Sequence, residues 1–351
     1  MTSPNEIAKV WFLPWNRKHE LAKLLELSSA AAPFHEGDFC AVKMHFGERG
    51  NDGYIRPEYL APFLQMISAC KGRAFLTDTC TIYAGPRKDA LGHLEVAAEH
   101  GFTQESVGVP VIIADGLHGT DDEQVEVAGT HFRSVKIARA IAHADSMLVL
   151  SHFKGHLMGG FGGAIKNLGM GCGSRRGKFE MHSGATPQVD AALCKRCGAC
   201  VTACDHRAIS LTKVSAQISI DRCVGCGECV LVCPYGAMGL AWNQGPKQVQ
   251  ERYAEYALGA VKGKRAFYVN FLNHITPNCD CLSEGEDSLV ADIGILASSD
   301  PVAIDQACYD LVLKAGGDVF AQTHPGVDGT VQLAHAENIG LGSRTYDLIE
   351  V

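Results

Sequence analysis

Two cysteine-rich stretches decide how this chain is built: CKRCGACVTACDH at residues 194–206 and CVGCGECVLVCPYG at residues 223–236. In each stretch two residues separate the first three cysteines, and three residues precede the fourth. The same intervals therefore occur twice within about forty residues. This doubled run is typical of two [4Fe–4S] clusters, in which the fourth cysteine of each run ligates the other cluster.

The spacing predicts two separate ligand sets. One cluster is expected on Cys194, Cys197, Cys200 and Cys233, and the other on Cys223, Cys226, Cys229 and Cys204. Zinc, which also binds paired cysteines, is the alternative. Asp205 follows the first run where a proline is usual, whereas Pro234 follows the second. Between the runs, residues 208–221 alternate apolar and polar side chains, which predicts a short hairpin.

The composition of the chain excludes several classes of protein. The 351 residues carry a net charge of −8, which argues against nucleic acid or anionic lipid as the main partner. No apolar run of about 18 residues predicts a membrane span, and the first residues lack the pattern of a secretory signal. Fifteen cysteines in such a chain favour metal or redox chemistry over a disulfide framework, so we expect a cytoplasmic protein.

The residues on both sides of the cysteine runs predict one discontinuous α/β domain, 1–187 and 244–351, which carries residues 188–243 as an insert. Short apolar segments alternate there with amphipathic ones, which indicates a mostly parallel sheet with helices on both faces. The expected strands are 9–13, 39–46, 74–78, 110–114, 147–152, 265–272 and 289–296. The expected helices are 19–31, 57–70, 88–100, 134–144, 248–259 and 301–314.

Polar side chains follow three of these strands, where open α/β sheets bind their ligands. Residues 155–177 contain nine glycines, whose backbone N–H groups can approach an anion closely. We expect Lys154 and Lys166 to bind an anion and His156 to supply protons, which makes these three the catalytic candidates. Tight packing of a glycine-rich loop against the insert is the alternative. Further polar residues at the strand ends are Lys43, His45, Glu48, Arg56, Asp78, Arg87, His152 and Asn167.

A third metal site, zinc or another iron–sulfur cluster, is expected in the segment NHITPNCDC, residues 273–281. Cys279 and Cys281 face the same way in an extended segment, so both sulfurs can reach one ion. Two thiolates do not complete a coordination shell, and Cys172 and His182 are the candidates to do so. Two inert thiols are the alternative. The other cysteines outside the insert are expected to be small buried side chains: Cys40, Cys70, Cys80 and Cys308.

Several motifs together resemble the iron–sulfur members of the family catalogued as domain of unknown function 362. They are KMHFGE (43–48), TDTCTIYAGPRKDALGHLEVAAEHGF (77–102), SHFKGHLMGGFGGAIKNLGMGCGSRRGK (151–178), the cysteine runs, NHITPNCDC and DIGILASSDPVAIDQA (292–307). The resemblance implies an α/β core with an inserted bacterial ferredoxin-like (α+β) module and two [4Fe–4S] clusters. Asp292, Asp300 and Asp305 match the last motif, either as acidic residues at the pocket or, for Asp300, as the cap before Pro301.

These observations predict an iron–sulfur redox protein, a possible ferredoxin-type oxidoreductase. It would transfer electrons to a substrate or metal centre held by the α/β domain. The alternatives are a non-enzymatic ferredoxin-type carrier and a metal or cofactor assembly protein. Residues 188–243 carry four acidic and five basic side chains, so the insert lacks the acidic surface by which carrier ferredoxins are steered to partners. The expected partner is a redox protein or a small-molecule substrate.

Overall fold

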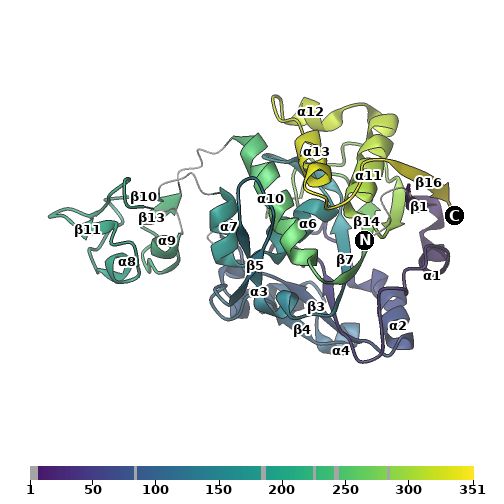
Figure 1. Ribbon diagram of the computed structural model, residues 1–351, viewed down its shortest axis with the longest axis horizontal. Helices are drawn as coiled ribbons and strands as arrows, with labels where there is room; N and C mark the ends of the chain where they lie inside the picture. Colours follow the sequence, from purple (N-terminus) through teal and green to yellow (C-terminus); the bar gives the residue numbers. More distant parts are fainter. Residues whose placement is uncertain (1–6, 83–84, 183–186, 224–226, 241–244, 283–284) are drawn as a thin grey trace.

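The computed structural model describes residues 7–82, 85–182, 187–223, 227–240, 245–282 and 285–351. At its centre lies an eight-stranded sheet with the order β16-β1-β15-β14-β7-β2-β3-β4 (Figure 1). In that order the strands are β16 (Tyr346–Glu350), β1 (Ala8–Pro14), β15 (Gly294–Ser298), β14 (Arg265–Leu272), β7 (Ser146–His152), β2 (Phe39–Lys43), β3 (Arg73–Asp78) and β4 (Val111–Ile113). Only β15 runs antiparallel to its neighbours in this sheet. The prediction of a mostly parallel α/β sheet is confirmed.

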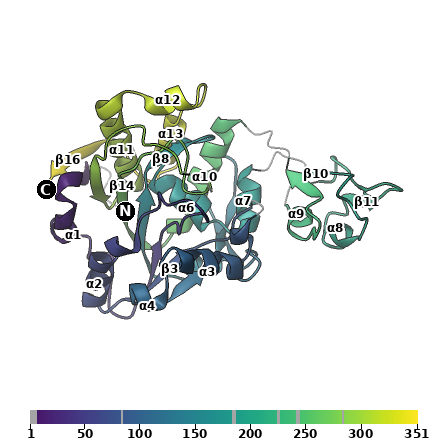
Figure 2. The same ribbon diagram turned by 180° about the vertical axis from the view of Figure 1, so that it is seen from behind.

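Helices cover both faces of this sheet, as the sequence predicted (Figures 1 and 2). The strand β7 shows why, because Met147 and Val149 pack into the core on one face while Leu148 and Leu150 pack into the core on the other. The first core is closed by α6 (Ala164–Cys172), α10 (Pro246–Val261), α11 (Pro301–Gly316) and α13 (Thr330–Asn338). The second is closed by α1 (Leu21–Leu27), α2 (Ala61–Ala69) and α3 (Ala90–Glu99).

Shorter elements complete this domain. The remaining helices are α4 (Gln104–Val107), α5 (Arg139–Ala142), α7 (Arg175–His182) and α12 (Val319–Thr323), with 3-10 turns η1 (Trp15–Glu20), η2 (Pro57–Tyr59) and η3 (Pro86–Lys88). Two hairpins stand outside the sheet, β5 (Asp122–Glu126) with β6 (Ser134–Ala138), and β8 (Lys154–His156) with β9 (Gly160–Gly162). No helix among the described residues is long and apolar enough to cross a membrane.

Two predictions of secondary structure were wrong. Residues 134–144 were expected to form one helix, but 134–138 form strand β6, and only the four residues of α5 are helical. Val135 and Ile137 alternate with polar neighbours and are fully buried, which is the two-residue period of a strand. Pairing with β5 supplies the backbone hydrogen bonds of this strand. The last predicted strand, 289–296, begins instead at Gly294 and continues to Ser298.

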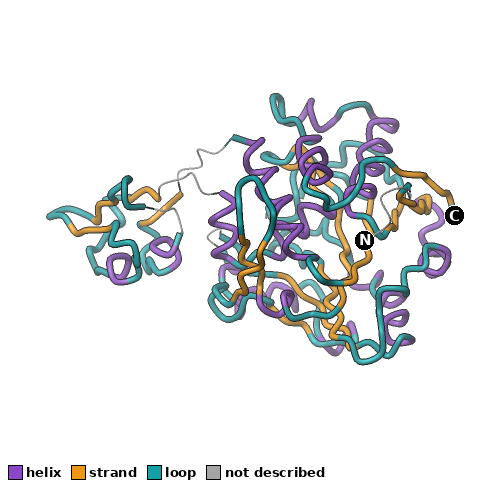
Figure 3. Tube along the Cα trace, in the orientation of Figure 1, coloured by secondary structure: helices purple, strands orange, loops and turns teal. Residues whose placement is uncertain are grey.

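The described residues between 187 and 240 add no strand to the central sheet and form a separate small lobe beside α7 and α10 (Figures 1 and 3). The lobe contains β10 (Pro187–Val189), α8 (Ala199–Thr202), β11 (Ile209–Leu211), β12 (Ala216–Ile218), α9 (Glu228–Leu231) and β13 (Met238–Leu240). β10 pairs antiparallel with β13, and β11 with β12. The hairpin predicted between the cysteine runs is therefore confirmed.

Candidate functional site

A cleft opens at the carboxyl ends of β2, β3 and β7, where Lys43, Asp78 and His152 lie. It contains about 1050 Å³ of space that no protein atom fills, including open solvent at its mouth. Among the described residues, five lysine and arginine side chains line it, together with two aspartates. These are Lys43, Arg87, Lys154, Lys166 and Lys178, with Asp78 and Asp280.

Lys43 and Asp78 form a buried ion pair at the floor of this cleft. The Lys43 ammonium lies 3.0 Å from Asp78 Oδ1 and also donates to Asn167 Oδ1 at 2.7 Å. Burial alone would raise the pKa of Asp78, but the charge of Lys43 and neighbouring cations outweigh it and hold the pKa well below its usual range. The Asp78 carboxylate is therefore the counterion of Lys43, so this pair is not the main attraction for a charged ligand.

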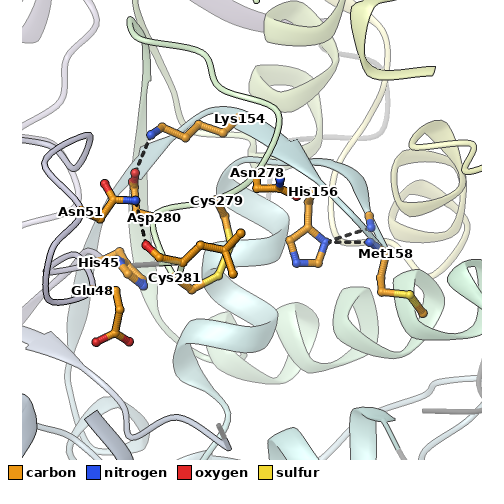
Figure 4. Close-up of a disulfide and its surroundings, with 12 residues drawn as sticks. His45, Glu48, Asn51, Lys154, His156, Met158, Asn278, Cys279, Asp280 and Cys281 are labelled. Carbon is orange, nitrogen blue, oxygen red and sulfur yellow. Dashed lines mark hydrogen bonds and ion pairs between the residues drawn. A yellow bond between two sulfur atoms is a disulfide. The ribbon is translucent and has the colours of Figure 1, made fainter. Parts of the chain in front are cut away.

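Asp280 organises a second network at the wall of the cleft, between Cys279 and Cys281. Its carboxylate accepts from the Lys154 ammonium (Figure 4). It also lies 3.0 Å from His152 Nδ1. Burial would raise the pKa of Asp280, but His152 and Lys154 hold it well below its usual range. Lys154, a predicted anion ligand, is thus present in the cleft with Asp280 as its counterion.

Lys166 differs from Lys154. It projects from the first turns of α6 and lines the cleft, with no hydrogen bond or ion pair from a described residue. Burial lowers the pKa of Lys166 to about 8, against the opposing charge of Asp280. The glycine-rich loop makes room for it, since a Cβ on Gly162 would lie 2.6 Å from Lys166 Cδ. The lack of a side chain at Gly162 therefore lets the Lys166 side chain occupy this position, which favours an anion pocket over simple packing of the loop.

His156 is held in one tautomer. Its Nδ1 accepts from the backbone N–H groups of Met158 and Gly159 at 3.2 and 2.9 Å (Figure 4). Nε2 therefore carries the proton of the neutral ring. Burial and the nearby Lys166 charge lower the pKa of His156 well below its ordinary value. This arrangement suits a neutral hydrogen-bond donor to a ligand better than the proton supply that we expected from the sequence.

Arg87 offers another donor to a ligand in the cleft. Its side chain is 1% exposed, with Nε 2.9 Å from Glu48 Oε2 and Nη1 3.0 Å from His45 Nε2. Nη2 is buried and has no hydrogen-bond partner among the described residues. A buried guanidinium nitrogen without an acceptor is costly, so an anion in the cleft would complete its hydrogen bonding.

The four residues of the expected third metal site are only partly brought together. Cys279, Cys281 and His182 line the cleft, whereas Cys172 is buried in the core of the α6 face. Cys279 and Cys281 are joined by a disulfide. Among the described residues, no three or more His, Cys, Asp or Glu side chains form a group that could hold a metal ion.

The structure places the remaining candidates as follows. Arg56 stacks over Tyr54 and lies outside the residues that line the cleft. Asp300 caps α11 by accepting from Val302 and Ala303, which confirms the cap interpretation. Asp305 instead accepts from the N–H groups of Ala164 and Ile165, so it caps α6 from a distant element. Asp292 accepts from the backbone N–H of His274.

Sequence reasoning missed several residues that line the cleft. Lys178 on α7 donates to the carbonyl of Cys80 and to Thr79, which also lines the cleft. Thr81 and Met170 complete this side. Lys178 is the last residue of the glycine-rich motif at 151–178. A single sequence, however, does not distinguish a buried lysine that donates to carbonyl groups from a lysine at the surface.

In the small lobe, two cavities separate the predicted cysteine sets. One is lined by all four cysteines of the first set, Cys194, Cys197, Cys200 and Cys233. The other is lined by Cys204, Cys223 and Cys229 of the second set, whereas Cys226 lies outside the described residues. Backbone N–H groups donate to the sulfurs of Cys194, Cys204 and Cys233 at 3.3–3.4 Å.

The fold and the site thus define an α/β protein with a cationic cleft at the carboxyl ends of its parallel strands. The chain belongs to the family described as domain of unknown function (DUF362), which matches residues 40–310. No curated protein matches it.

Two solved structures are similar to this chain. The lactate racemase apoprotein from Thermoanaerobacterium thermosaccharolyticum is 13% identical with a TM-score of 0.40, covering 77% of this chain and 52% of that one. A crystal structure of a Thermotoga maritima protein is 11% identical with a TM-score of 0.42, covering 85% and 58%. The chain therefore spans little more than half the length of the solved proteins that it matches.

Proposed function

We propose that this chain is an iron–sulfur redox protein whose ferredoxin-like insert, residues 188–243, transfers electrons to an anionic substrate in the cleft. The observation that supports this most is the separation of the insert cysteines into two cavities. Among the cysteines that the structure describes, each cavity is lined by members of one predicted ligand set and by none of the other. The crossed pattern, with Cys233 beside the first run and Cys204 beside the second, is the pattern that two [4Fe–4S] clusters require.

The cysteine surroundings also fit this cofactor. Backbone N–H groups that donate to Cys194, Cys204 and Cys233 would stabilise negative charge on coordinated thiolates. When bound, a [4Fe–4S] cluster supplies a site that gains and loses electrons. The protein's own contribution is to hold eight thiolates in two sets and to shield part of each set from water.

Helix α7 gives the insert a route to the cleft. Arg176 on α7 forms an ion pair with Glu228 of the insert, and Phe179 packs so closely on Gly227 that a Cβ there would clash. Lys178 and His182 of the same helix line the cleft. Gly227 and Glu228 also line the cavity of the second cysteine set, so α7 contacts the lining of that cavity and itself lines the cleft.

The cleft residues support an anionic substrate. Lys166 and Arg87 present donors with no described acceptor, and His156 presents Nε2–H. In a site shielded from water, such donors bind a negative group more strongly than they would at the surface. A donor protein would deliver electrons at the insert. The cytoplasm suits this function, because its reducing conditions keep ligand cysteines as thiols until clusters assemble.

Iron analysis of anaerobically purified protein tests this proposal. We expect about eight irons per chain, and a paramagnetic signal of [4Fe–4S] type after reduction. Cys197→Ala and Cys229→Ala should each remove about four irons, because they belong to different sets. Cys70→Ala, outside the insert, is the control and should retain all of the iron.

Two results would contradict the proposal. Zinc in place of iron would indicate structural sites of the zinc type. Unchanged iron in both ligand variants would mean that the cysteine sets are wrongly assigned.

A further inference from the structure

The cleft contains a pair of sulfurs with no role in the function proposed above. Cys279 and Cys281 lie in the connection between β14 and β15, and both line the cleft. They are joined by a disulfide and are only partly buried (Figure 4). A solute that enters the cleft can therefore reach them, unlike the fully buried thiols Cys40 and Cys308.

The residue between them holds this segment in place independently of the sulfurs. Asp280 is 5% exposed. It is held by His152, at the end of β7, and by Lys154, at the start of β8. Asn51 adds a hydrogen bond to the carbonyl of Leu282 at 2.9 Å. Because these contacts do not involve sulfur, the segment keeps its position when the S–S bond is broken. Both sulfurs would then stay in the cleft as a dithiol.

The charges around the pair suit thiol chemistry. The Lys154–Asp280 ion pair and His156 lie beside the two cysteines (Figure 4). Lys166 lines the same cleft. A nearby ammonium favours thiolate over thiol, and thiolate is the form that attacks a disulfide. Lys166 has no competing carboxylate partner among the described residues, so its charge is available to a thiolate or to an anionic ligand.

We propose that Cys279 and Cys281 are a redox-active pair that passes two electrons from the insert to a disulfide substrate bearing an anionic group. This inference rests on the proposed function, since the insert supplies the electrons. In the first half, two electrons from a low-potential one-electron donor and two protons from solvent convert the S–S bond to two thiols. A dithiol then reduces other disulfides without a further cofactor, which is why a disulfide is the substrate class.

The second half is thiol–disulfide exchange. One cysteine thiolate attacks a substrate sulfur, forms a mixed disulfide and releases one substrate thiolate, which takes up a proton. The other cysteine attacks the mixed disulfide, restores the bond between Cys279 and Cys281, and releases the second substrate thiol. In sum, one substrate disulfide, two electrons and two protons give two thiols.

Anaerobic reductive titration tests the pair directly. With dithionite and a viologen mediator, the wild-type protein should take up about four electrons, one for each cluster and two for the disulfide. The double variant Cys279→Ser/Cys281→Ser should retain its iron and take up about two. Cys70→Ser, a half-buried cysteine on the α2 side of the sheet, should match the wild type.

A second measurement tests the substrate class. Reduced protein is mixed with oxidised glutathione, an anionic disulfide, or with cystamine, a cationic one. We expect the anionic probe to react at least tenfold faster and to need both cysteines. Mass spectrometry of the peptide that contains residues 279–281 should show it lacking two hydrogens after the reaction.

Each adverse outcome has a distinct meaning. Equal electron uptake by the wild type and the double variant would overturn the redox pair, as would a metal ion that both cysteines hold. Faster reaction of cystamine would overturn the anionic substrate. Absence of iron would instead refute the proposed function, and with it the electron source, even if chemical reductants still opened the disulfide.

Discussion

The insert and the α/β domain differ in how much apolar surface they bury. The α/β domain buries two large apolar cores, one on each face of its sheet, made mostly of Val, Ile, Leu, Phe and Ala side chains. The insert has one small cluster of five buried residues: Cys200, Ile209, Ala216, Cys229 and Met238. Two of these five are predicted cluster ligands.

This difference has a physical origin in size. A lobe of about fifty residues buries too little apolar surface to offset the conformational entropy of its chain, and such lobes usually need metals or disulfides. The larger domain buries two extensive apolar cores instead. We therefore expect the fold of the insert to depend on its metal, and the fold of the α/β domain to be independent of it.

The largest expected effect is the loss of the insert alone. Removing iron with a chelator under anaerobic conditions should make residues 187–240 sensitive to protease, while the central sheet stays intact. Limited proteolysis with mass spectrometry locates the cuts, and circular dichroism follows the sheet domain. If the insert resisted protease equally well without iron, its fold would not depend on metal, and the expected difference between the two regions would be wrong.

The next effect lies in the α/β domain. Leu148→Ala removes a fully buried side chain from β7, and such changes cost about 2–5 kcal/mol in the free energy of unfolding. Iron bound per folded chain should not change. Leu91→Ala, at an exposed position of α3 in the same domain, is the matched control and should cost about 0.5 kcal/mol or less. Chemical denaturation measures the free energy of unfolding of both variants. Similar losses in the two would contradict the tight packing of Leu148 in the core.

A smaller effect concerns pH and the cleft. Lys166 has a pKa lowered to about 8, so its charge is lost as the pH rises through that value. Sulfate, measured by calorimetry, should bind roughly tenfold more weakly at pH 9 than at pH 7. Lys166→Ala should bind weakly at both pH values, and Lys71→Ala, an exposed control, should behave as the wild type. A pH effect that survives in Lys166→Ala would refute this assignment.

The same pKa shift has an opposite consequence for stability. The native state loses the Lys166 proton near pH 8, whereas the unfolded chain keeps it up to the ordinary value of 10.5. The contribution of Lys166 to stability therefore rises between these two values and is unfavourable below them. Substrate binding and stability thus respond to pH in opposite directions at this residue.

The smallest effect lies where the two regions meet. Arg176→Ala removes a partly exposed ion pair with Glu228, worth about 1 kcal/mol or less. Iron content and the melting temperature should barely change, while electron transfer from the reduced insert to the Cys279–Cys281 pair should slow. Stopped-flow spectroscopy of the cluster absorbance measures this rate. An unchanged rate would show that α7 is not the route.

Much of the fold was predictable from local sequence. Period-two and continuous apolar segments located β1, β2, β3, β7 and β14, since each strand buries side chains on both faces of one sheet. The helix predicted at 134–144 failed because pairing of β6 with β5 is a nonlocal event. The reversed direction of β15 is also nonlocal, because it depends on the neighbours that the strand meets.

The candidate site divides in the same way. The sequence alone predicted which cysteines form two sets, because the interval between neighbouring cysteines of one run is a local property of the chain. It also located the lysines and glycines after β7, because carboxyl ends of parallel strands meet at one edge of a sheet.

Only the tertiary structure decided which of these charges is free. Lys154 and Lys166 are alike in the sequence, but Asp280, 126 residues after Lys154, neutralises the first and leaves the second without a described partner. The tertiary structure also brought the Cys279–Cys281 pair into the cationic cleft and left Cys172 in the core. The reason is physical: burial and distant charges determine the state of an ionisable side chain, and neither is encoded by its immediate neighbours in the chain.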